Sequence, residues 1–310
     1  MWNTMGEKSR WYSNLEVKKA ISEQMQNREA IWMQVAPSRD KPFWVRKSRA
    51  ESPQSVQYWL DSLGYQYNGV GAFIGTNLID WEQVDILPPS LRTKGFHRRS
   101  YSDIWKEYLI PSKCNDRGLV WSDIWIGKTL LFDFDSPKNP LWAFERADNV
   151  ATHLTSEYGA ECFVVFSGSK GFHVHVGLED SRRLVGLDWA DYHDHKDPLK
   201  VIGQAHADKV VELASEAGVN YTTEDRSSNF RQGIVRCPYT IHPKTGQIVW
   251  PLDMKSIEAL RNKENLDIEG VAKTIHKWDI PNQSRIAELE YTYITPEFKI
   301  KDRGLPRFVA

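Results

Sequence analysis

A short apolar run that ends in two acids constrains this chain more than any other feature. Residues 130–135 read LLFDFD, in which leucine and phenylalanine are typical of a core β-strand, and the Ser136-Pro137 pair then ends the strand. Side chains at positions i and i+2 point to the same face of a strand and lie about 7 Å apart along it. We therefore expect Asp133 and Asp135 to project together from the end of a buried strand.

Two carboxylates in this position have a structural and a chemical interpretation. The strand can simply emerge into solvent there, with a basic side chain opposite the acids. Alternatively, the pair can hold Mg²⁺ or Mn²⁺, which take oxygen ligands and often bridge to substrate phosphates. An Asp-x-Asp pattern occurs in many proteins, including metal-dependent glycosyltransferases, so the surrounding sequence has to separate these possibilities.

Helix-capping and turn residues divide the chain into alternating elements. Helices are expected after Asn14, after Ser52-Pro53 as far as Gly64, from Pro140 to Gly159, from Pro198 to Gly218, and around 254–262 and 267–276. Strands are expected at 30–36, 161–166, 172–178, 233–236 and 247–250. The order from residue 129 onward, with tight turns between neighbouring strands, predicts a mixed α/β fold that contains antiparallel hairpins.

Two further stretches carry polar residues at turns. Residues 164–178, VVFSGSKGFHVHVGL, place Ser167, Lys170 and His173 around a glycine-rich turn that is suited to binding phosphate. A glycine-rich hairpin with surface histidines remains the alternative. Residues 233–246, GIVRCPYTIHPKTG, add three more polar groups, and the acids upstream of them offer a third ligand: Arg236, His242, Lys244, Glu224 and Asp225. Taken alone, this last stretch reads as a surface loop rich in turn formers.

In combination, these stretches resemble the catalytic core of the archaeo-eukaryotic primase family, especially its small catalytic subunit. The shared pattern is a strand ending in D-F-D, then S-G-S-K-G-x-H, then an acid followed by R-x-P-x-x-x-H-x-K. The resemblance covers about residues 28–250 and is strongest over 130–246. It implies a catalytic sheet related to the RNA-recognition module, packed on an N-terminal α/β unit at 1–120. Within a core at 121–255 it implies a helical insertion at about 180–220, followed by a C-terminal segment at 256–310.

The resemblance also implies roles for individual residues. Asp133, Asp135 and Asp225 would hold divalent metal, Mg²⁺ or Mn²⁺, with Glu224 as a rival third ligand. Six residues would contact the nucleoside triphosphate: Ser167, Lys170, His173, Arg236, His242 and Lys244. The implied reaction is DNA-templated nucleotidyl transfer, in which a primer 3′-hydroxyl attacks the α-phosphorus and pyrophosphate leaves. The implied partners are a single-stranded DNA template with its primer, nucleoside triphosphates and a primase large subunit.

Three other functions remain open. A gap-filling repair polymerase of the same fold would extend primers without starting them. A non-catalytic nucleic-acid-binding relative and an Asp-x-Asp glycosyltransferase come from other classes, and the S-G-S-K-G-x-H stretch has no evident use in the glycosyltransferase. Two basic segments with aromatic residues, 39–49 and 92–99, are candidates for template contact. The histidines of 193–195 are read as part of a polar loop.

Composition excludes several classes of protein. The 310 residues carry a formal net charge of −1 and three cysteines without a C-x-x-C pair, which argues against a zinc site or a disulfide framework. No apolar run is long enough for a signal peptide or a membrane span. We therefore expect no membrane partner and an intracellular, cytoplasmic or nucleoid-associated protein.

Overall fold

The computed structural model describes most of the chain between residues 10 and 275. The described ranges are 10–35, 43–47, 50–64, 69–81, 125–187, 192, 195, 197–221, 229–230 and 233–275, and residues 43–47 are described by their backbone alone.

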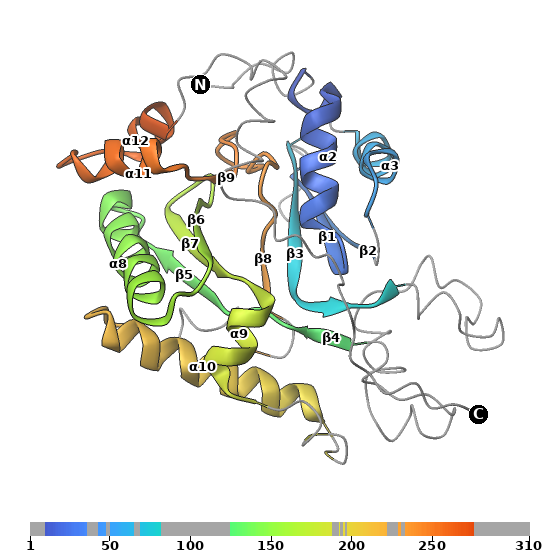
Figure 1. Cartoon of the computed structure of the whole chain (residues 1–310). Coiled ribbons are helices and arrows are strands. Elements are labelled where there is room, and N and C mark those ends of the chain that lie inside the picture. Colours follow the sequence, from blue (N-terminus) through green and yellow to red (C-terminus); the bar gives the residue numbers. More distant parts are fainter. Residues whose placement is uncertain are drawn as a thin grey trace, which may run out of the picture.

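The first of two antiparallel sheets combines early and late parts of the chain. It has the order β2-β1-β3-β4, and a fifth strand, β8, also pairs with β3. The strands are β1 (Arg28–Val35), β2 (Phe43–Lys47), β3 (Gly69–Ile79), β4 (Trp125–Lys128) and β8 (Ile234–Arg236). Helices α2 (Leu15–Gln24) and α3 (Pro53–Leu63) contact each other, and their buried residues share a core with β1 and β3 (Figure 1).

The second sheet has the order β5-β7-β6-β9, which leaves β5 at an edge. Its strands are β5 (Leu131–Asp135), β6 (Cys162–Phe166), β7 (Gly171–Val176) and β9 (Trp250–Pro251). Helix α8 (Pro140–Tyr158) contacts β5, β6 and β7. The remaining helices are α9 (Leu178–Val185), α10 (Pro198–Glu216), α11 (Met254–Arg261) and α12 (Ile268–Ile275), and α11 and α12 lie beside the end of α8 (Figure 1).

The helix boundaries follow from the capping residues that the sequence offers. The Asn14 side chain accepts from the Glu16 N–H at the start of α2, and Ser52 forms a reciprocal capping box with Ser55 at the start of α3. Gly64 and Gly159 end α3 and α8 in the left-handed conformation that glycine adopts without strain. These predicted helix limits are confirmed.

Two strand predictions need correction, and strands β2, β3 and β4 were not predicted. The strand expected over 172–178 ends at Val176, because Gly177 caps α9, which starts at Leu178. The strand expected over 247–250 is reduced to β9, with a single bridge between Ile241 and Ile248 before it. Strand β3 was not predicted, because its sequence GVGAFIGTNLI is broken by glycines that weaken strand propensity.

One continuous hydrophobic core joins the two sheets. It includes Trp32 from β1, Phe134 from β5, Phe144 from α8 and Phe172 from β7, each at most 1% exposed. The rings of Phe144 and Phe172 meet edge to face at a centroid distance of 5.4 Å, which fixes α8 on the sheet. Among the described residues, no helix combines the length and apolarity needed to cross a bilayer.

The expected mixed α/β class with antiparallel hairpins is therefore confirmed. Strands β4 and β8 lie within residues 121–255 but pair with β3 of the first sheet. The division of the chain into units ending at 120 and 255 stays a prediction.

Substitution of Gly171 tests whether β5 and β7 must lie as close together as they do here. A Cβ atom at this position would lie 2.3 Å from both the Asp135 Oδ1 and the Phe134 carbonyl oxygen, whereas a Cβ at Gly75 of β3 would meet nothing closer than 3.6 Å. We predict that Gly171→Ala lowers the free energy of unfolding by about 3 kcal/mol, because the overlap is with backbone. The matched Gly75→Ala change should cost less than about 1 kcal/mol in the same urea titration. Equal effects of the two changes would contradict this packing.

Candidate active site

The two acids lie side by side at the end of β5, as the sequence predicts. Asp133 pairs with His173 and Asp135 pairs with Gly171 across the β5–β7 ladder. The Asp133 side chain is 35% exposed and that of Asp135 is 41% exposed, while the intervening Phe134 is fully buried. The alternation of β5 therefore turns both carboxylates away from the aromatic core and toward solvent.

Lys170 faces this acid pair from the β6–β7 turn. Its Nζ lies 2.8 Å from Asp135 Oδ2, and both Asp135 and Asp133 raise the pKa of this lysine. The turn itself is closed by two hydrogen bonds between Ser167 and Gly171, one of which the Gly171 N–H donates to the Ser167 Oγ at 3.2 Å. The structure thus brings Lys170 to the acids, and the Ser167 hydroxyl helps to shape the turn that carries it.

His173 lies behind Asp133 rather than on the surface. It is 4% exposed, and its Nε2 is 3.4 Å from Asp133 Oδ1. Burial lowers the pKa of His173 to about 4, the Arg236 charge acts in the same direction, and Asp135 opposes both. The imidazole is therefore neutral at pH 7, and its Nε2 packs against the Asp133 carboxylate.

The third stretch folds back onto the turn of the second. Gly168 has a φ of 76°, and a Cβ there would come within 2.8 Å of the His242 Cβ. The Thr245 hydroxyl donates to the Gly168 carbonyl at 2.5 Å, and the Thr245 N–H donates to the His242 Nδ1 at 3.2 Å. Because Nδ1 accepts, the neutral His242 ring carries its proton on Nε2.

Arg236 completes the basic side of the site. Its guanidinium carbon lies 4.0 Å from the centroid of the Phe73 ring on β3, and its Nη2 is 3.3 Å from the His242 Nε2. Burial lowers the pKa of Arg236 to about 10, so it remains charged at pH 7, and burial together with Arg236 and Lys244 lowers the pKa of His242 to about 3. The Nη1 of Arg236 is buried without a hydrogen-bond partner among the described residues.

Several residues that build this site were missed in the sequence. Gly69 and Gly71 of β3 lie against the third stretch, where a Cβ would come within 2.6 Å of the Pro243 and Ile241 carbonyl oxygens. The Tyr12 hydroxyl accepts from the Ile241 N–H at 2.8 Å and donates to the Val70 carbonyl at 3.0 Å. The closely spaced glycines before the acid strand were the available signal, since strand glycines often mark a close backbone approach.

Some predicted site residues fall outside the described part of the chain. These are Asp225 and its rival Glu224, the basic segment 92–99, and most of 39–49, of which β2 is described by its backbone. His193, which is read as part of a polar loop, also lies outside the described ranges. Lys244 is described and exposed, and its charge contributes to the shift at His242. Within the described ranges, no group of three or more His, Cys, Asp or Glu side chains could hold a metal ion, so the third ligand stays a prediction.

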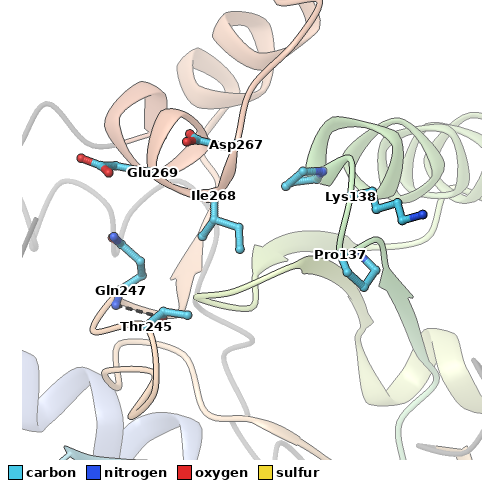
Figure 2. Close-up of a pocket in the computed structure, with 8 residues that line it drawn as sticks. Pro137, Lys138, Thr245, Gln247, Asp267, Ile268 and Glu269 are labelled. Atoms are coloured by element: carbon cyan, nitrogen blue, oxygen red, sulfur yellow. Dashed lines mark hydrogen bonds between the residues drawn. The ribbon is translucent and has the colours of Figure 1, made fainter.

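A groove of about 440 Å³ opens beside the third stretch. Thr245 and Gln247 face the loop that carries Pro137 and Lys138, and the start of α12 forms the remaining wall (Figure 2). The full lining is Pro137, Lys138, Pro140, Thr245, Gln247, Asp267, Ile268 and Glu269. One lysine and two acids give this groove a mixed charge, in contrast to the basic group formed by Lys170, Arg236 and Lys244.

Comparison with known proteins supports the primase resemblance. The chain is similar to an archaeal DNA primase small subunit. That protein, the DNA primase small subunit PriS of Pyrobaculum islandicum, is 27% identical over an alignment that covers 43% of this chain and 54% of the relative. The chain thus spans about half the length of the curated relative it matches. No family model matches the sequence.

Two solved structures show weaker similarity. The polymerase domain of Mycobacterium tuberculosis ligase D in complex with DNA is 14% identical, with a TM-score of 0.47 and coverage of 88% of each chain. The primase-polymerase domain of cyanophage S-2L is 11% identical, with a TM-score of 0.33 and coverage of 80% of this chain and 89% of that domain.

The burial of three histidines makes the free energy of unfolding depend on pH. Burial lowers the pKa of His173 to about 4 and the pKa values of His206 and His242 to about 3. Between these values and the unfolded value near 6.5, the unfolded state binds more protons than the native state, so stability falls as the pH falls. We expect the free energy of unfolding to drop by about 2 kcal/mol or more between pH 7 and 5.5 in urea titrations.

His206 provides a control outside the acid pair, because it is fully buried on α10 with its ring nitrogens near the Ile202 and Lys128 carbonyl oxygens. His206→Gln should reduce the pH slope of the free energy of unfolding, since one proton-binding site of the unfolded chain is removed. A stability that is constant between pH 7 and 5.5 would show that these histidines are not buried in the neutral form.

Proposed function

We propose that this protein is a DNA-templated nucleotidyltransferase of the primase or primase-polymerase type, which synthesises or extends primers. The observation that carries the proposal is the convergence of three separate stretches. The acid pair of β5, the Lys170 turn and the Arg236–His242 pair contact one another through Asp135, Asp133 and Gly168. A glycosyltransferase that used only the Asp-x-Asp pair would have no evident need for the other two stretches.

The acid pair suits a hard divalent cation. Asp133 and Asp135 offer oxygen donors on one accessible face, which is the ligand type that Mg²⁺ and Mn²⁺ prefer. We assign the cation to Asp133, Asp135 and Asp225, with Glu224 as the alternative third ligand. When bound, it would lower the pKa of the primer hydroxyl and neutralise charge on the phosphates. His173, neutral and buried, would limit the orientations of the Asp133 carboxylate by packing its Nε2 against Oδ1.

The basic residues suit a triphosphate. Arg236 Nη2 and the protonated Nε2 of His242 are two donors only 3.3 Å apart, and they need a shared acceptor such as a phosphate oxygen. Arg236 Nη1 and Lys170 add further donors, and Lys244 adds an exposed positive charge. These groups would hold the triphosphate in line for attack by the primer hydroxyl. The groove beside α12 is less suited to a polyanion because Asp267 and Glu269 line it.

The first test removes the charge of one acid and keeps the size of its side chain. Asp133→Asn should lower incorporation of labelled nucleotides, with Mn²⁺ and primed single-stranded DNA, by at least about a thousandfold, because it removes a metal-binding charge. Glu258→Gln on the exposed face of α11 is the control and should leave the rate unchanged. Near-normal incorporation by Asp133→Asn at saturating metal would contradict the proposal. The same assay without primer separates a primase from a gap-filling polymerase.

Substitution of Lys170 tests whether this residue binds the triphosphate. Lys170→Ala should raise the KM for the nucleotide roughly tenfold, since a charged hydrogen bond is worth about 1.5 to 3 kcal/mol. The affinity for single-stranded DNA, measured by fluorescence anisotropy, should stay unchanged, and Lys170→Arg should restore part of the KM. A loss of DNA affinity with an unchanged KM would mean that Lys170 serves the template instead.

A further inference from the structure

Within the described residues, side chains cover the open edge of β5, and no strand pairs with it there. The Asn229 side chain accepts from the Leu131 N–H at 3.0 Å and donates to the Leu131 carbonyl. The Tyr221 hydroxyl accepts from the Asp133 N–H at 2.8 Å. These bonds satisfy backbone groups that an edge strand otherwise leaves to water.

Both side chains are buried where they meet β5. Asn229 is 0% exposed and Tyr221 is 6% exposed. The Tyr221 ring packs edge to face against Phe132 at 5.9 Å and against Phe134 at 5.2 Å. These two phenylalanines flank Asp133 in the sequence, so Tyr221 holds the acid residue through its own amide and through both neighbours. A third bond, from Lys128 Nζ to the Phe230 carbonyl at 3.0 Å, anchors the residue after Asn229 to β4.

We propose that Tyr221 and Asn229 are positioning residues, which hold the acid end of β5 in the geometry that binds a divalent cation. The inference rests on the proposed function. Tyr221 acts through the Asp133 amide and Asn229 through Leu131, two positions earlier on the same face of the strand. In the sequence the two residues bracket positions 222–228, which include the predicted third acid Asp225 and its rival Glu224. Removing a residue that orients a metal ligand, without touching the metal itself, typically lowers metal affinity 10- to 100-fold.

The test uses Tyr221→Phe, which removes one oxygen and keeps the ring that packs on Phe132 and Phe134. The matched control is Tyr158→Phe, which removes a surface hydroxyl that donates to Glu216 at 2.6 Å. Mn²⁺ binding to the full chain is measured without nucleotide, from the electron paramagnetic resonance signal of free Mn²⁺. We expect the dissociation constant to rise about tenfold for Tyr221→Phe and to stay unchanged for Tyr158→Phe.

A second measurement separates positioning from a general loss of structure. Hydrogen exchange of the Asp133 amide should be faster in Tyr221→Phe, while the amides of β6 keep their protection. The affinity for single-stranded DNA should not change. Asn229→Asp, which keeps the acceptor for the Leu131 N–H but loses the donor to the Leu131 carbonyl, should also weaken Mn²⁺ binding.

The outcomes distinguish this inference from the function on which it rests. A wild-type chain that neither binds Mn²⁺ nor incorporates nucleotides would refute the proposed function. A wild-type chain that does both, with Tyr221→Phe equal to it in Mn²⁺ affinity, would overturn the positioning role alone. Weaker Mn²⁺ binding with an unchanged Asp133 amide exchange rate would also overturn it, because the effect would then not pass through that amide.

Discussion

The pairing of β5 with β7 is the constraint on which the rest of the site depends. Its register sets Asp133 opposite His173 and Asp135 opposite Gly171, and a shift by one residue would turn both acids into the aromatic core. Gly171 permits the close approach that lets Lys170, the residue before it, reach Asp135. The same register buries His173 in its neutral form behind Asp133. The β5–β7 register therefore determines the strand pairing, the core packing and the positions of the charged groups in the site together.

A second level of organisation comes from the contact between the two sheets. Arg236 lies on β8 of the first sheet, and its guanidinium rests on Phe73 of β3, yet its charge acts on His173 of the second sheet. The loop with His242 lies on the glycines of β3 and bonds to the β6–β7 turn through Thr245. The positions of Arg236 and His242 thus depend on the packing of the His242 loop against the first sheet.

Local sequence signals predicted much of this structure, and non-local contacts explain the remainder. Caps such as Ser52 and Gly159 act within a few residues, so the helix limits could be predicted, and the i, i+2 spacing was enough to pair Asp133 with Asp135. Strand β3 escaped prediction because its glycines serve contacts with Pro243 and Ile241, more than 160 positions away in the sequence. Tyr12 and Asn229 were missed for the same reason, since their partners lie on distant strands.

In the proposed function, the acid pair and the basic residues form a single site for a metal-bound triphosphate. Anomalous diffraction from crystals grown with Mn²⁺ and a non-hydrolysable nucleoside triphosphate tests it most directly. We expect Mn²⁺ density in contact with both Asp133 and Asp135, with phosphate oxygens bound to Arg236, His242 and Lys170. Mn²⁺ bound away from the acid pair, or a triphosphate lying in the groove between Thr245 and Glu269, would contradict it.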